Sequence, residues 1–260
     1  MRIDFFEEFP ERGELQKAKL LDFDCTTYIA AKSFKEFKGF KRQLEKINPN
    51  VEAGYWPILQ KSYWISPFSY SAEIEGLSEE LRACGKKHLK VLLDLEFPLL
   101  KKGLFLRNLP YFLRNKNKIK ELFRDSEKFG LEILAAEYPS PTRAYQKFLE
   151  IGGISYSFDK FPNHKKVIMY YTSVMNELRS KDVWNHITKG VLSESKKYRN
   201  KIKMGVGVIA GGILGDENIL SPLRLDRDLE LLKNNHIDNV VIFRLGGLNK
   251  DYMEVIKKFV

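Results

Sequence analysis

Apolar runs alternate with amphipathic stretches along the whole chain, and this alternation predicts a parallel α/β fold. The predicted strands cover residues 2–7, 25–31, 51–56, 89–96, 131–137, 166–172, 202–209 and 239–244. Stretches with helical periodicity lie between them. Eight such units in 260 residues match a (β/α)8 TIM barrel that forms a single domain over residues 1–260.

Capping signals mark several of the predicted helices. Ser33 followed by Glu36 forms a capping box, and Gly130 closes the helix that starts at Asn115. Two connections are long enough to hold short helical insertions, near residues 101–115 and 173–200. A doubly wound open sheet is the competing architecture, but the chain lacks a glycine-rich turn after its first strand.

The fourth predicted strand ends in two carboxylates, Asp94 and Glu96. Side chains alternate between the two faces of a strand, so both acids share a face with Leu92, while Leu93 and Leu95 face the other way. In a closed parallel barrel we expect both acids to point into the mouth, where barrels of this kind carry their chemistry.

Such a pair fits glycoside cleavage, which needs a proton donor beside the glycosidic oxygen and a second group that stabilises the developing cation. Repulsion and partial burial should raise one pKa and keep that carboxyl protonated near neutrality. Glu96 lies nearer the carboxyl end of the strand and is therefore the predicted general acid. The alternative is a structural pair bound to a lysine or arginine inside the barrel.

These motifs resemble family-18 chitinase-like glycosidases, which end their fourth strand in D-x-E and carry a Met-x-Tyr-Asp segment on the sixth. This chain has Asp94-Leu95-Glu96 and Met169-Tyr170-Tyr171-Thr172 at those places. The resemblance implies that Glu96 is the general acid, that Asp94 orients the 2-acetamido group of the substrate, and that Tyr171 hydrogen-bonds that group. The chain departs from the family pattern at Thr172, where the family has aspartate.

Rings and a further acid near the predicted mouth suggest substrate-binding residues. Aromatic faces stack on sugar rings, and the loop after the third strand is rich in them. A local hydrophobic cluster is the other interpretation of these rings. The predicted sugar-binding residues are Tyr55, Trp56, Trp64, Met169 and Glu137.

Other acids lie at strand ends. Glu137 could serve as an additional acid or base, and Glu7 and Glu8 could also reach the mouth. For all three we favour a solvated carboxylate.

Glycine pairs after the last two strands support a second hypothesis, a phosphate-handling lyase or isomerase. Backbone N–H groups of these loops bind phosphate in many TIM barrels, and an arginine there can bind it bidentately. The residues concerned are Gly211, Gly212, Arg244, Gly246 and Gly247. The alternative is that the barrel needs small residues where it turns sharply.

The net charge of +10 favours anionic partners, and the excess is concentrated in residues 101–120, which hold seven Lys or Arg and no acid. An anionic glycan, a membrane surface or nucleic acid could bind there. We favour a solvated segment whose apolar residues cap the barrel. A third hypothesis follows, a non-catalytic barrel that binds an anionic partner.

The remaining composition narrows the function classes. Neither Cys25 and Cys84 nor the four histidines have a metal-ligand spacing, so we expect no metal site, and the proposed chemistry requires no cofactor. No apolar run is long enough to span a bilayer, and no secretory signal is visible. We therefore expect a cytoplasmic protein acting on a small molecule or oligosaccharide. The Lys-rich and Glu-rich composition resembles that of thermophiles.

Overall fold

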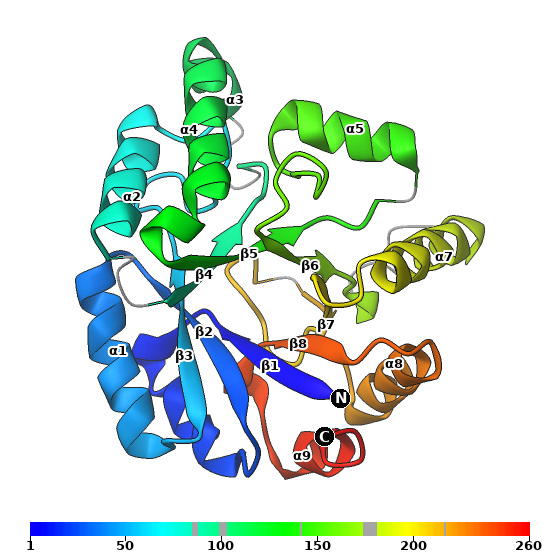
Figure 1. Ribbon diagram of the computed structural model, residues 1–260. Coiled ribbons are helices and arrows are strands. Elements are labelled where there is room, and N and C mark those ends of the chain that lie inside the picture. The colour runs from blue at the N-terminus through cyan, green and yellow to red at the C-terminus, as the bar shows by residue number, and fades with distance from the viewer. Residues whose placement is uncertain (85–87, 99–102, 141, 174–180, 216) are drawn as a thin grey trace.

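The computed structural model describes residues 1–84, 88–98, 103–140, 142–173, 181–215 and 217–260. Eight parallel strands pair in chain order and close into a barrel, with the last strand beside the first (Figure 1). The strands are β1 (Arg2–Glu7), β2 (Cys25–Ala31), β3 (Val51–Pro57), β4 (Leu89–Asp94), β5 (Leu131–Glu137), β6 (Lys165–Met169), β7 (Ile202–Gly207) and β8 (Asn239–Phe243). The predicted (β/α)8 TIM barrel is confirmed.

Helices surround the barrel and mostly follow the predicted alternation. They are α1 (Phe34–Ile47), α2 (Ser71–Cys84), α3 (Gly103–Asn108), α4 (Phe112–Asp125), α5 (Arg143–Gly152), α7 (Lys181–Lys197), α8 (Pro222–Asn234) and α9 (Lys250–Ile256). After β1 a 3-10 helix, Glu14–Leu20, stands in place of an α-helix. The Ser33 hydroxyl caps α1 by accepting the Glu36 N–H at 3.2 Å, as its sequence predicts.

The two predicted insertions contain helices. Helix α3 and the start of α4 occupy the first, although residues 101 and 102 lie outside the described residues. Helix α7 occupies the second, of which residues 174–180 lie outside the described residues. In the first insertion Leu104 is buried, but Leu106 and Leu113 are 82% and 72% exposed, so the apolar residues there cap the barrel only in part.

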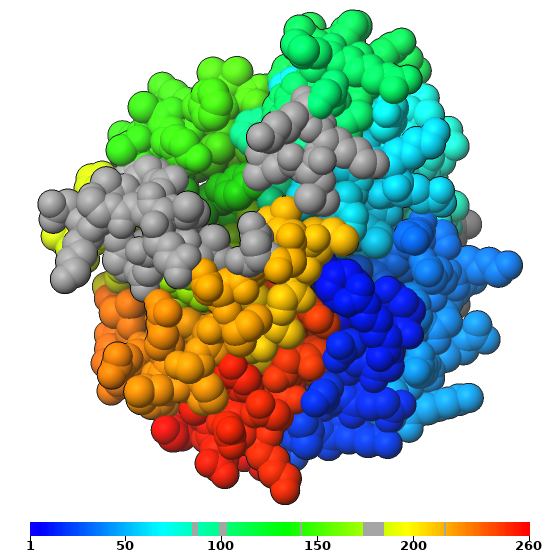
Figure 2. Space-filling view, turned by 180° about the vertical axis from the view of Figure 1, so that it is seen from behind, coloured from blue at the N-terminus to red at the C-terminus, as the bar shows by residue number. Residues whose placement is uncertain are grey.

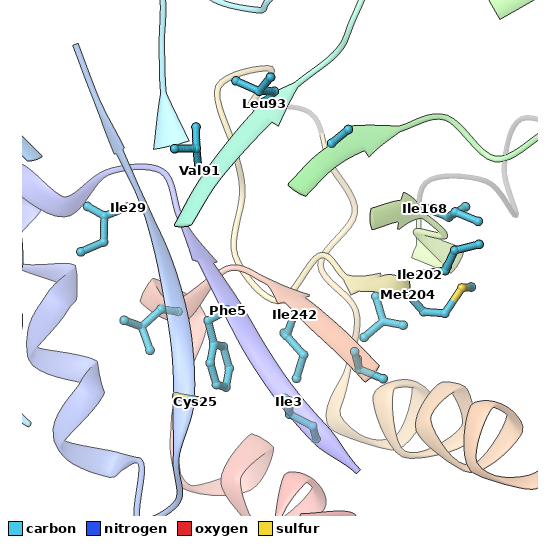
Figure 3. Packing of buried hydrophobic residues seen from close by; sticks show 14 of the residues in the cluster. Ile3, Phe5, Cys25, Ile29, Val91, Leu93, Ile168, Ile202, Met204 and Ile242 are labelled. Carbon is cyan, nitrogen blue, oxygen red and sulfur yellow. The ribbon is translucent and has the colours of Figure 1, made fainter. Parts of the chain in front are cut away.

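One side of each strand packs against the helices. Ile3 and Phe5 of β1, Val91 and Leu93 of β4 and Ile242 of β8 all point outward into this layer (Figure 3). All five are completely buried. This layer between strands and helices is the larger hydrophobic core of the molecule, and every second residue of a strand belongs to it.

The other side of each strand faces the barrel axis. Phe6, Tyr28, Leu92 and Leu134 fill the interior together with smaller apolar side chains. Nearer the amino ends the completely buried Asp4 accepts the backbone N–H of Thr26 at 2.8 Å and pairs with Lys203. Side chains thus fill the barrel interior towards the amino ends of the strands. The inward residues closest to the carboxyl ends remain available to line a site.

Candidate active site at the barrel mouth

Four carboxylates line one pocket at the carboxyl ends of the strands. Asp94 ends β4 and Glu96 follows it, Glu8 follows β1, and Glu217 lies in the loop after β7. The pocket has about 460 Å³ of empty volume. Figure 2 faces this end of the barrel and shows the amber loop after β7 beside the blue segment after β1. Gly212 of that loop is close enough that an added Cβ would lie 2.8 Å from Glu8 Oε2.

Asp94 and Glu96 form a pair of buried carboxyls within this pocket. Both line its wall, as the strand alternation predicts. Burial raises the pKa of both carboxyls, and the charge of Glu96 raises the pKa of Asp94 further. Tyr138 donates its hydroxyl to Glu96 Oε2 at 2.6 Å, and this bond and one from Asp94 act to lower the pKa of Glu96. The surroundings therefore favour protonation of Asp94 over protonation of Glu96.

Glu8 is a third carboxyl of this pocket, and its pKa lies near neutrality. Burial raises its pKa from 4.5 to about 7, although a hydrogen bond from Tyr63 and the positive charge of Arg244 act to lower it. The Oε2 atom of Glu8 is buried and has no hydrogen-bond partner among the described residues. A buried acceptor of this kind is satisfied by a donor on a ligand that enters the pocket.

Aromatic rings form the rest of the wall. Trp56, Trp64 and Tyr171 line the pocket together with Phe6 and Phe243. The rings of Phe6 and Trp56 lie 5.6 Å apart, and those of Tyr171 and Phe243 lie 5.9 Å apart. The indole N–H of Trp56 is buried and, within the described part of the chain, lacks an acceptor. Flat apolar faces beside carboxylates and an indole donor suit a ligand that is apolar on its faces and rich in hydroxyls at its edges.

Most of the residues predicted for catalysis and sugar binding meet in this one pocket. They are Asp94, Glu96, Tyr171, Trp56, Trp64 and Met169. The chemical roles assigned to them stay predictions, because a position in a pocket does not test a role.

Tyr55 does not belong to this group, which corrects the predicted sugar-binding set. Its ring stacks on Phe37 of α1 with centroids 5.0 Å apart, and its hydroxyl donates to Glu80 of α2 at 2.7 Å. Neighbouring residues of a strand face opposite ways, so Trp56 points into the barrel and Tyr55 points out of it.

Glu137 is also placed away from the mouth. It pairs with Lys166 at 2.9 Å, and it accepts hydrogen bonds from the Ser155 hydroxyl at 2.5 Å and the Tyr156 N–H at 3.1 Å. Both side chains of the ion pair are only 3% exposed. Glu137 is therefore a structural carboxylate behind β5, neither the predicted additional acid or base nor the solvated group that we favoured.

The glycine pairs surround a carboxylate that the chain supplies itself. Arg244 pairs with Glu7 at 3.0 Å and donates to the Gly211 carbonyl at 3.0 Å, and the Gly246 N–H donates to Glu7 at 2.7 Å. Glu7 is completely buried, not the solvated carboxylate that we favoured, and it occupies the donors that a phosphate would need. A Cβ on Gly247 would lie 2.1 Å from the Ile209 carbonyl oxygen. Close backbone approach explains this glycine, and the geometry does not favour the phosphate hypothesis.

Sequence reasoning missed several residues of the site. Glu8 is 5% exposed in the pocket, not the solvated strand-end acid that we favoured. Tyr138 lies two residues beyond the inward Ala136, so strand alternation extended past the strand end would have found it. Tyr63 and Glu217 come from loops, for which the chain carries no periodic signal.

The described part of the chain lacks two kinds of feature, a metal-binding cluster and a membrane-spanning helix. No three of its His, Cys, Asp and Glu side chains are grouped in a way that could hold a metal ion. None of its helices combines the length and the apolar character that crossing a bilayer requires.

No protein-family model matches the sequence, and no curated protein matches it either. Solved structures do match the fold. A mutant family-18 chitinase from Cycas revoluta in complex with (GlcNAc)4 is 12% identical, with a TM-score of 0.59 over 100% of this chain and 99% of that one. A chitinase from Chromobacterium violaceum is 10% identical, with a TM-score of 0.58 over 99% and 98%.

Other solved barrels with sugar-related names match as well. A xylose isomerase domain protein from Planctomyces limnophilus is 10% identical, with a TM-score of 0.55 over 99% of this chain and 94% of that one. At these identities the likeness concerns the fold. The chain therefore shares a barrel fold with family-18 chitinases, as the sequence motifs led us to expect.

Proposed function

We propose that this protein is a glycoside hydrolase-like enzyme that cleaves a carbohydrate in the pocket at the barrel mouth. The observation that carries the proposal is the pair of carboxyls Asp94 and Glu96, whose pKa values burial raises, inside a pocket walled by aromatic rings. A carboxyl that stays protonated near neutrality is what protonation of a glycosidic oxygen requires. The fold shared with chitinases supports the same choice of substrate class.

Glu96 is the proposed general acid. It is half-buried, whereas Asp94 is 7% exposed and lies deeper, so Glu96 is the member of the pair that a substrate reaches first. When a glycoside binds beside Glu96, the proton of the pair passes from Asp94 to Glu96 and then to the glycosidic oxygen as the bond to the leaving group breaks, and water supplies the oxygen that finally bonds to the anomeric carbon. Asp94, left ionised, faces the developing positive charge.

Tyr171 and the two tryptophans are proposed to hold the sugar. Burial raises the pKa of the Tyr171 phenol in this pocket, and the charges of the neighbouring acids raise it further, so its hydroxyl remains a donor. Trp56 and Trp64 offer ring faces for stacking and an indole N–H. The chitinase complex with (GlcNAc)4 makes oligomers of N-acetylglucosamine the first substrates to test.

The test is turnover of 4-methylumbelliferyl glycosides of N-acetylglucosamine oligomers by the wild-type chain and by Glu96→Gln. Loss of a general acid typically costs about 10²- to 10⁴-fold in rate, and this range is the expected fall in kcat. Glu132→Gln is the matched control, since it makes the same change at a partly exposed carboxylate outside the pocket. Equal rates for Glu96→Gln and the wild type would exclude the proposed acid.

A second outcome would indicate a barrel that binds carbohydrate without cleaving it. If the wild-type chain binds N-acetylglucosamine oligomers by calorimetry but turns over none of the glycosides, the barrel is a carbohydrate-binding protein. Trp64→Ala would then weaken binding, while Glu96→Gln would leave most of it intact.

A further inference from the structure

A second hollow lies on the outside of the barrel, between α4, α5 and the loop that precedes β6. It has about 1030 Å³ of empty volume and opens to solvent. Five cations and one carboxylate line it, namely Lys116, Lys120, Arg124, Lys147, Lys160 and Glu150. We call this hollow the basic groove, and no residue of the pocket at the mouth contributes to it.

The cations of α4 form a regular row. Lys116, Lys120 and Arg124 recur every four residues, so they lie on one side of the helix with about 6 Å of axial rise between neighbours. Lys147 of α5 and Lys160 reach the same groove from two other segments. The groove therefore carries a line of positive charge along α4 and further cations on its other walls.

These charges are not neutralised by the described part of the chain. The two acids of α4, Glu121 and Asp125, pair with lysines and an arginine outside the groove. Lys116 donates to the carbonyl of Ile151 at 2.7 Å, and Glu150 accepts a weak bond from Gln146 at 3.4 Å. One carboxylate among five cations leaves the groove with a large positive excess.

The cations also repel one another. Burial lowers the pKa of Lys116, and the charges of Lys120 and Lys160 lower it further. Crowded like charges raise the free energy of the fold unless a counter-charge is bound. An anion in the groove would remove this penalty.

The groove offers no ring face to a nucleobase. Its aromatic lining consists of Tyr156 and Phe161, which are 2% and 9% exposed. Single-stranded nucleic acids gain much of their affinity from stacking on exposed rings. The concave shape likewise does not fit a flat bilayer surface.

We propose that the basic groove binds a linear acidic polysaccharide, whose carboxylates recur once per sugar residue along the row of cations. A chain of this kind supplies spaced anions and needs no stacking surface. The inference goes beyond the proposed function, because binding at the outer groove does not require turnover at the mouth. Part of the excess positive charge of residues 101–120 lies in the basic groove, since Lys116 and Lys120 belong both to that segment and to the groove lining.

The experiment measures binding of a hexagalacturonate labelled at its reducing end by fluorescence anisotropy at several salt concentrations. The variant Lys120→Gln/Arg124→Gln/Lys147→Gln removes three cations that face the groove. We expect its Kd to rise roughly tenfold or more, and the slope of log Kd against log salt to fall by about two, as loss of three contacts predicts. Near-ultraviolet circular dichroism checks that the variant folds.

The matched control is Lys35→Gln/Arg42→Gln/Lys46→Gln, which removes the same charge from exposed positions of α1 that do not line the groove. Its Kd should stay within about threefold of the wild type. Equal weakening in both variants would overturn the proposal, because net charge alone would then explain binding. Tighter binding of a hexamer of deoxythymidine, or no binding of hexagalacturonate, would overturn it too.

Discussion

Two adjacent lysines of β6 lie on opposite faces of the strand, so substituting each of them tests the alternation of inward and outward side chains. Lys166 faces outward and pairs with Glu137 at 2.9 Å, and both side chains are 3% exposed. Lys165 faces inward near the open amino end and pairs with Glu132 at 2.6 Å, with exposures of 41% and 43%. The two pairs join the same two strands through the same chemical groups, so burial is the main difference between them.

Replacing Lys166 by methionine leaves the Glu137 carboxylate buried with two neutral donors, the Ser155 hydroxyl and the Tyr156 N–H. Removing one partner of a buried ion pair destabilises a protein by about 3–5 kcal/mol. The same change at Lys165 removes a solvated pair, for which about 0–1 kcal/mol is expected. The free energy of unfolding should therefore fall several times more for Lys166→Met than for Lys165→Met.

Urea unfolding at pH 7, followed by far-ultraviolet circular dichroism, measures both losses. The double variant Lys166→Met/Glu137→Gln should recover much of the stability, because it no longer buries a lone charge. Equal losses in the two single variants, or a loss below about 1 kcal/mol for Lys166→Met, would refute the structural role assigned to Glu137.

Further predictions concern the pocket. The folded chain keeps a proton on Glu8 up to pH 7 while the unfolded chain loses it near 4.5, so the wild type loses stability as the pH rises through this range. Urea unfolding should show Glu8→Gln gaining about 3 kcal/mol relative to the wild type between pH 4 and pH 8, and a constant difference would contradict this. Tyr138→Phe removes a bond that lowers the pKa of Glu96, so the pH profile of kcat/KM should move to higher pH, and a superimposable profile would disprove the contact's effect. Trp64→Ala should raise KM about tenfold, whereas Tyr55→Phe should change neither KM nor kcat, and a raised KM for Tyr55→Phe would contradict its outward placement.

The fold and the core of the site were predictable because both depend on local patterns. Eight apolar runs define the barrel, and within one run the alternation of Leu92, Asp94 and Glu96 fixes which way the acids point. The same rule applied to the third strand separates Tyr55 from Trp56. The predicted sugar-binding set included both because it was chosen by residue type and not by strand face.

Other parts of the site could not be predicted from local patterns. The run that ends at Glu137 is apolar on both faces, as strands of parallel sheets are, so its sequence does not say which face points inward. The contact between Glu7 and Arg244 joins positions 237 residues apart. Glu8 and Tyr63 meet through the closure of the barrel, and nothing in either segment alone indicates the other.

The alternation of inward and outward side chains also determines how this protein could acquire new activities. Outward positions such as Phe5 and Leu93 hold the helices in place, whereas inward positions near the rim such as Trp56 and Met169 carry little of that packing. A directed-evolution library confined to the inward rim should therefore yield a larger share of folded variants than one confined to the outward residues beside them. Selection could then explore substrates while the packing between strands and helices stays unchanged.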